Sequence, residues 1–253
     1  MLLAHSCASH AARAVVLPNA PSQPVTLNGG MSMPSWFDIR GLGPDTPEAA
    51  GDIEEAVAWM KELAAREVAA GIPAERVIFG GFSQGGAMAL RALLTSEERH
   101  GGAVALSTWL TLRQTYEGKT LPEHVKDAPV FMGHGSSDAV VAFERGIQSK
   151  ELVEAMGLRA LEWKVYHGMA HSSCPQEMAD LAKFLLAALP AGYQLPAPSE
   201  DEVRAMGVGA LKKLITARGG SYKGLFEKSE LVDAAIALLP SSAGGPAHGA
   251  SAL

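Results

Sequence analysis

Short apolar runs and amphipathic stretches alternate along most of the chain, and each kind predicts a different element. Runs rich in β-branched and other apolar residues predict buried strands over residues 14–17, 76–79, 103–107 and 130–135, and alternating residues predict a half-buried strand over 161–166. Apolar residues at helical spacing predict helices over residues 45–70, 87–94, 144–156 and 178–189. Strands that alternate with helices indicate a doubly wound, mostly parallel α/β sheet.

Residues 21–38 interrupt this pattern, and we predict a long irregular loop there. The loop contains four large apolar side chains: Met31, Met33, Trp36 and Phe37. Leaving them all in water would be costly, so we expect the loop to pack on the body of the protein or to line a pocket. The helix that follows is expected to begin at Asp45, a capping residue with a proline and an acid close behind it.

Length and charge narrow the class of protein. With 253 residues the chain has room for one α/β domain and a small appendage, and its net charge of −6 argues against broad phosphate binding. No apolar run approaches the length of a membrane span, and two cysteines, Cys7 and Cys174, suit a reducing compartment. We therefore expect a cytoplasmic protein without a transmembrane segment. Residues 1–12 are too weakly apolar for a secretory signal, but a fragment of a transit peptide stays open.

Residues 80–86, Gly-Gly-Phe-Ser-Gln-Gly-Gly, lie between a predicted strand and a predicted helix. This is the context of a nucleophile elbow, in which a serine sits on a strained turn with its hydroxyl projecting. Gly81 and Gly85 let neighbouring backbone pass without a Cβ clash. We therefore predict Ser83 as a nucleophile and the backbone N–H of Gln84 as a donor to an oxyanion.

Two loops that follow predicted strands offer an acid and a base. Asp138 and His171 lie beyond the carboxyl ends of their strands, where groups converge on one face of an open sheet, and their order after the serine is that of α/β-hydrolases. His167 stays a rival for the base, and His134 is a weaker one. Cys174 is expected to be a small buried apolar side chain. The histidines lack metal-ligand spacing, so no metal or other cofactor is predicted.

Four separated segments resemble the acyl-protein thioesterases, serine hydrolases of the phospholipase/carboxylesterase group. They are residues 33–38 (MPSWFD), 80–86 (GGFSQGG), 134–141 (HGSSDAVV) and 171–177 (HSSCPQE), in the family's order. The resemblance covers residues 14–190 and implies an α/β-hydrolase fold. It also implies that Ser83, Asp138 and His171 form a catalytic triad.

The same resemblance implies a substrate class. Members hydrolyse long-chain thioesters on S-palmitoylated proteins, or oxyesters such as lysophospholipids and other carboxylesters. The substrate would then be an acylated protein or a lipid ester. Met33, Trp36, Trp109 and Leu110 would help to form the groove that binds the acyl chain.

The chain departs from the family at its start. Members begin with a strand that ends in a His-Gly-Leu-Gly-Asp-like turn, which supplies the second oxyanion N–H, and a helix follows. Residues 2–6 echo this turn only faintly, and residues 6–13 are too few for a helical crossover between parallel strands. We expect the sheet to lack this first strand, or its place to be filled irregularly. Weak turnover should follow, because losing one oxyanion donor lowers turnover by about 10²–10³-fold.

A second, small unit is predicted after the hydrolase domain. Residues 191–198 are a Pro-rich linker, and residues 210–215 and 231–236 predict two short helices of a module over 199–240 that resembles a SAP module. Such modules bind nucleic acid or protein partners, and the balanced charge here disfavours nucleic acid. Docking on the hydrolase domain stays an equal alternative to binding a protein partner. Residues 241–253 are expected to be disordered.

Together these patterns predict a serine hydrolase of long-chain thioesters or esters. An alternative from a different class is a catalytically impaired hydrolase scaffold that acts as an adaptor through residues 199–240. The sequence feature that separates the two is the unusual start of the chain.

Overall fold

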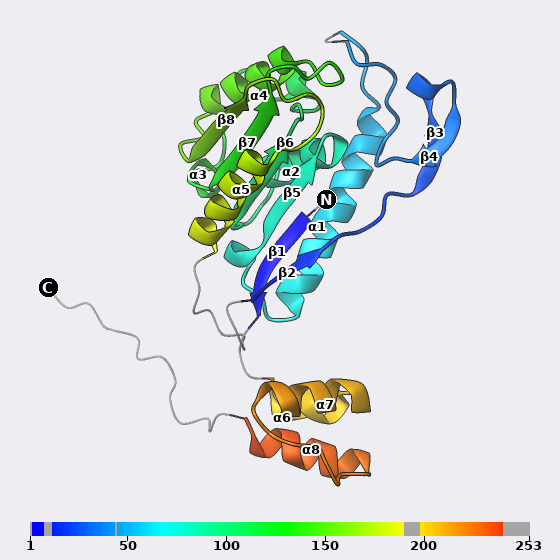
Figure 1. Ribbon diagram of the computed structural model, residues 1–253, viewed down its shortest axis with the longest axis vertical. Helices are drawn as coiled ribbons and strands as arrows, with labels where there is room; N and C mark the ends of the chain where they lie inside the picture. The colour runs from blue at the N-terminus through cyan, green and yellow to red at the C-terminus, as the bar shows by residue number, and fades with distance from the viewer. Residues whose placement is uncertain (1, 8–11, 44, 190–197, 240–253) are drawn as a thin grey trace, which may run out of the picture. The chain divides into compact units, whose positions relative to one another are not determined.

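In the part of the chain described by the computed structural model, residues 2–7, 12–43, 45–189 and 198–239, six strands form the main sheet (Figure 1). Their order across the sheet is β2 (Ala12–Val16), β1 (Leu2–Cys7), β5 (Ile78–Phe82), β6 (Gly102–Leu106), β7 (Val130–Gly135) and β8 (Leu161–Tyr166). Strands β5 to β8 are parallel. The predicted doubly wound α/β fold is therefore confirmed.

Strands β1 and β2 form the other side of the sheet and run antiparallel. β1 pairs with β5, with Leu3 opposite Phe79, and β2 pairs with β1. β1 thus lies beside β5, the strand that leads to Ser83, as a regular strand that runs in the opposite direction. Only residues 8–11 separate β1 from β2, and so short a connection can join antiparallel strands but not parallel ones.

A strand was predicted correctly near residues 14–17, but the prediction that it is buried is wrong. The strand exists as β2, but 50% of Val15 and 71% of Leu17 are exposed. β2 pairs with β1 alone and lies at the edge of the sheet, so its apolar side chains lack a second neighbouring strand.

The predicted irregular loop over residues 21–38 contains a two-stranded antiparallel hairpin. Strand β3 (Ser22–Val25) and strand β4 (Met31–Pro34) are joined by the 3₁₀ helix η1 (Thr26–Asn28) and two glycines. Gly29 and Gly30 have φ angles of 68° and 78°, which only glycine adopts readily, so they allow the chain to reverse. Phe37 is buried as expected, whereas Met31 is 67% exposed, so the packing prediction is correct only in part.

Helices cover both faces of the sheet. They are α1 (Ala50–Ala69), α2 (Gln84–Leu94), α3 (Glu123–Lys126), α4 (Phe143–Ala155) and α5 (Pro175–Ala188), with short 3₁₀ turns η2 (Ala74–Arg76) and η3 (Arg113–Thr115). In Figure 1, α5 crosses the front of the sheet, and α1 and α2 lie behind it. The core under α5 joins Ile78, Val104 and Phe131 from three neighbouring strands to Phe184 of the helix. These burials fix the strand ends at which the site residues lie.

Helix α1 begins at Ala50, and the predicted start at Asp45 is wrong. The helix has no side-chain cap, and residues 46–49 are not helical. Glu48, expected inside the first turn, instead accepts hydrogen bonds from Trp109 Nε1 at 2.8 Å and from the backbone N–H of Leu112. These distant contacts hold residues 46–49 against the body of the protein.

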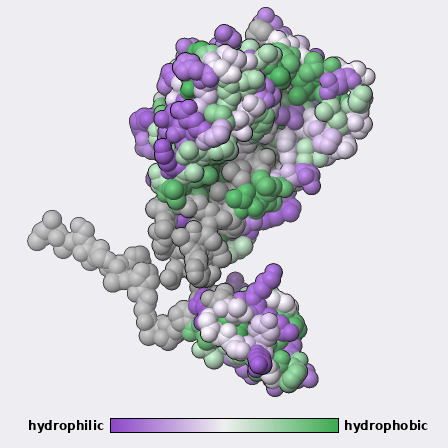
Figure 2. Space-filling view, viewed as in Figure 1, coloured by the Kyte–Doolittle hydropathy of each residue, from purple (hydrophilic) through white to green (hydrophobic). Residues whose placement is uncertain are grey.

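The chain divides into two compact units, residues 1–193 and residues 194–253. The second unit contains α6 (Glu200–Ala205), which was not predicted, and α7 (Val208–Ala217) and α8 (Lys228–Ala237), which were. Its small core is formed by Val203, Leu211, Ile215, Leu231, Val232 and Ala235. Hydrophilic and hydrophobic residues are mixed on the face visible in Figure 2. The resemblance to a SAP module stays a prediction, and the predicted linker and tail lie almost wholly outside the described residues.

None of the helices formed by the described residues is long and apolar enough to cross a membrane.

Candidate active site

Ser83 lies on a strained turn between β5 and α2. Its φ and ψ angles are 53° and −122°, a conformation that a residue with a side chain rarely adopts. The turn is held on both sides, because the backbone N–H of Ser83 donates to Leu106 O at 2.8 Å and Thr108 Oγ1 donates to Ser83 O at 2.6 Å. A Cβ on Gly81 would lie 2.2 Å from the carbonyl carbon of Gly85, so the turn requires glycine there.

His171 and Asp138 converge on this serine from two different loops. His171 Nε2 lies 3.0 Å from Ser83 Oγ, and His171 Nδ1 lies 2.8 Å from Asp138 Oδ2. The ring of Phe82 packs on the imidazole, with 4.7 Å between ring centroids. The structure therefore brings together the three residues that the sequence predicts as nucleophile, base and acid.

The hydrogen bonds among Asp138, His171 and Ser83 show which nitrogen of the imidazole carries the hydrogen. A carboxylate can only accept, so His171 Nδ1 must carry the hydrogen that it shares with Asp138. Nε2 is then left with its lone pair toward Ser83 Oγ, where it can accept the hydroxyl proton. Asp138 Oδ1 accepts from the backbone N–H groups of Val140 and Val141, both at 2.9 Å, which fixes the carboxylate in place. The arrangement can therefore activate the serine hydroxyl.

The loops that carry the acid and the base are in direct contact through their backbones. The N–H of Ser137 donates to Met169 O at 3.0 Å, and the N–H of Gly168 donates to Ser136 Oγ at 2.9 Å. A Cβ on Gly135 would lie 2.1 Å from Met169 O, so a side chain at that position would push the loops apart. The distance between Asp138 and His171 is thus set by contacts between main-chain groups and by the side chain of Ser136.

Neither rival histidine forms a described hydrogen bond with the Ser83 hydroxyl, which pairs with His171. His134 is buried, and its Nε2 donates to Val141 O at 2.9 Å while lying 3.4 Å from Asp138 Oδ2. Burial lowers the pKa of His134, so its ring supports the acid loop as a neutral group. His167 is exposed. The prediction that Cys174 is buried is wrong: it is half-buried at the start of α5, where Sγ accepts from the backbone N–H of Glu177.

The side chain of Gln84 has a role that sequence reasoning missed. Its backbone N–H lies at the start of α2, where an oxyanion donor is expected. Its side chain turns away and bridges to the segment before α1: Oε1 accepts from the N–H of Trp36 at 2.8 Å, and Nε2 donates to Phe37 O at 2.7 Å. No sequence spacing signals this contact between residues almost fifty positions apart.

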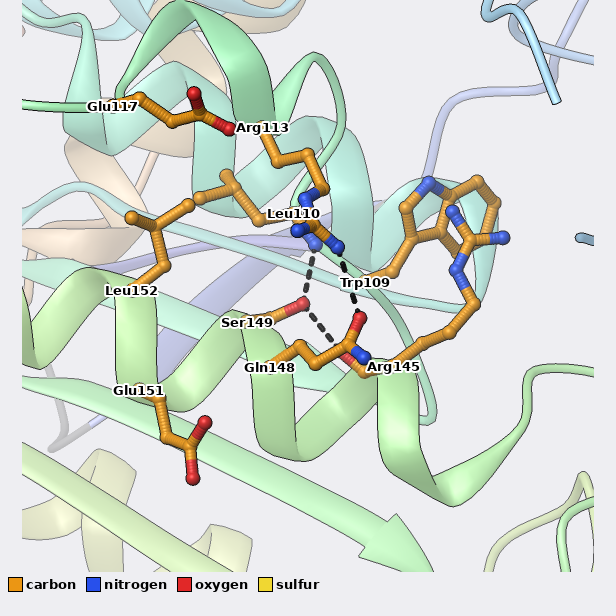
Figure 3. A pocket seen from close by; sticks show the side chains of 9 residues that line it. All are labelled: Trp109, Leu110, Arg113, Glu117, Arg145, Gln148, Ser149, Glu151 and Leu152. Carbon is orange, nitrogen blue, oxygen red and sulfur yellow. Dashed lines mark hydrogen bonds between the residues drawn. The ribbon is translucent and has the colours of Figure 1, made fainter. Parts of the chain in front are cut away.

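The four predicted substrate-binding residues do not share one cavity. Trp109 and Leu110 line a cavity of about 320 Å³ beside α4 (Figure 3). The cavity is mixed in character, because Arg113 and Arg145 also line it, and the Arg145 guanidinium lies 4.9 Å from the centre of the Trp109 ring. Trp36 lines a separate cavity of about 450 Å³, and Met33 is 37% exposed on β4. The described cavities thus separate Trp36 from Trp109 and Leu110, and a groove to which all four residues contribute stays a prediction.

One buried carboxylate lies between helix α5 and strand β7. Glu177 on α5 is fully buried, and neither of its carboxylate oxygens has a hydrogen-bond partner. A Cβ on Gly133 of β7 would lie 2.5 Å from its Oε1, so the carboxylate packs directly against that strand. Burial raises the pKa of Glu177 to about 7.

The chain is similar in sequence and in fold to known proteins. The phospholipase/carboxylesterase family matches residues 2–189. An acyl-protein thioesterase 1 of Cryptococcus neoformans is 43% identical over 189 residues, covering 69% of this chain and 79% of the relative. Arabidopsis thaliana SOBER1 superposes with a TM-score of 0.64 at 31% identity, covering 68% of this chain and 82% of that one. Zea mays acyl-protein thioesterase 2 gives 0.60 at 28% identity, covering 70% and 81%.

Proposed function

Since the chain belongs to the phospholipase/carboxylesterase family and is an ester or thioester hydrolase, we propose that it cleaves long-chain acyl thioesters or esters with Ser83, His171 and Asp138 as its catalytic triad. The observation that carries the proposal is the unbroken series of contacts from Asp138 through His171 to Ser83, at 2.8 and 3.0 Å. The strained backbone of Ser83 supports it, because strain of this kind is common at nucleophiles.

Acylation begins with proton transfer from Ser83 Oγ to His171 Nε2 as Oγ attacks the acyl carbon. The carbonyl oxygen becomes an oxyanion, and the backbone N–H of Gln84 donates a hydrogen bond to it. His171 then gives its proton to the leaving sulfur or oxygen, and the acyl group stays on Ser83. Asp138 stabilises the imidazolium that forms between these two transfers.

Deacylation repeats the same steps with water. A water molecule gives a proton to His171 Nε2 while its oxygen attacks the acyl-enzyme carbonyl. When the tetrahedral intermediate collapses, His171 returns the proton to Ser83 Oγ and the fatty acid leaves. Each proton that His171 accepts is therefore given back within the same half-reaction.

The proposed substrates are S-acylated proteins, lysophospholipids and related carboxylesters. The relatives from Cryptococcus and maize are both named acyl-protein thioesterases, which favours a thioester. The cavity lined by Trp109 and Leu110 offers apolar surface next to Thr108, whose hydroxyl contacts the nucleophile's carbonyl group. We place the acyl chain there, with Arg145 and Arg113 at its rim.

A fluorophosphonate probe tests the nucleophile directly. The purified full chain should be labelled on one serine, and Ser83→Ala should abolish the labelling. Ser221→Ala, which removes an exposed hydroxyl in the second compact unit, is the matched control and should label like the natural chain. Turnover should then be measured with a palmitoylated peptide thioester and with a lysophospholipid, and the higher kcat/KM identifies the substrate class.

Two outcomes would contradict the proposal. Labelling that persists in Ser83→Ala would remove that residue from the nucleophile role. A folded protein that neither reacts with the probe nor hydrolyses either substrate would favour the adaptor alternative.

A further inference from the structure

A second cavity lies apart from the one with Trp109, and its lining has a different chemistry. Its volume is about 450 Å³, and its lining residues are Asn19, Pro21, Gln23, Trp36, Asp52, Glu55, Ala56 and Trp59. They combine two tryptophans with two carboxylates, and none of them is basic. This cavity is called the tryptophan pocket below.

One wall of the tryptophan pocket is a single face of helix α1. Asp52, Glu55, Ala56 and Trp59 follow one another at intervals of three, one and three residues, so they lie one above the other along the helix. Trp59 is 37% exposed, although its size would favour burial. The helix therefore presents an aromatic ring and two acids to the same space.

The opposite wall is held rigidly. Trp36 packs on Trp59, with ring centroids 5.1 Å apart and planes inclined by 32°. Its backbone N–H is fixed by Gln84 at 2.8 Å, and Gln23 Nε2 donates to the neighbouring Ser35 O at 2.7 Å. The two rings thus form one aromatic surface whose position is set before any ligand arrives.

No described ion pair balances the negative charges of Asp52 and Glu55, so both carboxylates are available to a cationic ligand. Asp52 accepts only one long hydrogen bond, from the backbone N–H of Asp38 at 3.4 Å, and Glu55 has no ion pair or hydrogen bond within the described chain. An acyl chain would be disfavoured here, because hydrocarbon beside two carboxylates removes their water without replacing it. An anion would be repelled. An organic cation satisfies both features, since it is attracted to carboxylates and to the faces of tryptophan rings.

We propose that the tryptophan pocket binds a quaternary ammonium group. The cation would lie on the aromatic surface of Trp36 and Trp59, with Asp52 and Glu55 supplying the opposite charge. Trp36 connects the pocket to the nucleophile turn, because its backbone N–H donates to Gln84 Oε1, next to Ser83. The group has two possible sources: the choline head group of a lipid ester, or a free quaternary amine.

Binding is tested first without catalysis, on the Ser83→Ala full chain. Calorimetry with choline should give saturable binding, and the neutral isostere 3,3-dimethyl-1-butanol should bind about fivefold more weakly or worse, because it lacks the charge. Trp59→Leu and Glu55→Gln should each weaken choline binding by about fivefold, and Trp59→Phe should restore part of it. Glu62→Gln, an exposed acid further along α1 that does not line the pocket, is the matched control and should leave binding unchanged.

The second experiment distinguishes the two sources and rests on the proposed function. In the active enzyme, kcat/KM is compared for lysophosphatidylcholine and lysophosphatidylglycerol. If the lipid head group is the source, Trp59→Leu and Glu55→Gln should lower the choline-to-glycerol ratio by about fivefold, whereas Glu62→Gln should not. If the ratio stays constant while choline binding is lost, the ligand is a free quaternary amine. Failure to hydrolyse either lipid would count against the lipid-ester part of the proposed function, and the binding result would still decide the pocket.

The proposal is overturned if choline does not bind saturably, or if the neutral isostere binds as tightly as choline. It is also overturned if folded Trp59→Leu and Glu55→Gln bind choline as the parent does. Thermal unfolding of each variant establishes that it is folded.

Discussion

The side-chain oxygen of Gln84 accepts a hydrogen bond from the backbone N–H of Trp36, with 2.8 Å between nitrogen and oxygen. Gln84 follows the nucleophile directly, so this bond and its neighbour to Phe37 O tie the segment before α1 to the nucleophile turn. The backbone N–H of Trp36 has this side chain as its described partner, whereas Phe37 O also accepts from Ser35 Oγ at 2.7 Å.

Gln84→Ala should therefore destabilise the protein while keeping the backbone N–H that serves the oxyanion. Leaving the N–H of Trp36 unpaired costs about 1–3 kcal/mol where water cannot reach it, and Phe37 O loses one of its two donors but keeps Ser35 Oγ. We expect the melting temperature to fall by about 2–4 °C for each kcal/mol lost, measured by circular dichroism. Gln148→Ala, which removes an exposed glutamine of α4, is the control. Equal melting temperatures for the two variants would show that the Gln84 bridge contributes nothing.

Asp138→Asn should lower kcat by about 10⁴-fold, as in triads in which the histidine tautomer is lost. Asparagine can keep the oxygen that accepts from Val140 and Val141, so the loop should retain its shape. Its amide nitrogen would face His171 Nδ1 and favour the tautomer with the hydrogen on Nε2, which cannot accept the proton of Ser83. Hydrolysis of a short p-nitrophenyl ester measures the effect. Activity near that of the natural chain would exclude Asp138 from the site.

Glu177 should make the protein less stable as the pH rises. The unfolded chain releases the proton of this carboxyl near its usual pKa of 4.5, whereas burial raises the folded-state pKa to about 7. Between these values the folded state binds more protons than the unfolded state, so the free energy of unfolding falls with increasing pH. Above pH 7 the loss amounts to about 3 kcal/mol.

Glu177→Gln should remove this dependence, because glutamine has the same shape and does not ionise. Urea unfolding at pH 5 and pH 8 should give a smaller difference for Glu177→Gln than for the natural chain, with the variant gaining stability at pH 8. Glu151→Gln changes an exposed acid of α4 and should leave the difference unchanged. A pH dependence that is the same in all three proteins would contradict the assignment.

Gly81→Ala should prevent the nucleophile turn from forming, whereas Gly51→Ala should be tolerated. A methyl group at position 81 would lie 2.2 Å from the carbonyl carbon of Gly85, and backbone atoms cannot rotate aside. A methyl group at position 51, within α1, meets nothing within 4 Å, and alanine stabilises a helix relative to glycine by up to about 1 kcal/mol. Thermal unfolding of the two variants tests the pair. A Gly81→Ala protein with full stability and activity would show that the turn can relax.

The strands and the site loops could be predicted because their signals are local. The apolar runs that form β5 and β7 and the alternating run that forms β8 are bounded by turn residues, and Ser83, Asp138 and His171 lie in the turns and loops that follow these three strands. Parallel strands place their carboxyl ends at one edge, so the convergence of the three residues followed from chain order and topology.

The features that could not be predicted depend on contacts between distant residues. Helix α1 begins later than predicted because Glu48 accepts a hydrogen bond from Trp109, 61 positions away in the sequence. Local patterns that mark the start of a helix carry no information about so distant a partner. The direction of β1 depends on its pairing with β5 and on the short connection to β2. Trp36 follows strand β4 and Trp59 lies in helix α1, and only the folded chain brings the two rings together.

The interlocked loops after β7 and β8 have a consequence for how this protein can change. Gly135 leaves no space for a side chain beside Met169 O, and Ser137 bonds to that same oxygen. An insertion in either loop would shift both the acid and the base, so neither loop can be lengthened or exchanged alone. Grafting a loop from another hydrolase should succeed only when both loops come from the same donor. In engineering, residues 135–138 and 166–171 should therefore be exchanged together as one part.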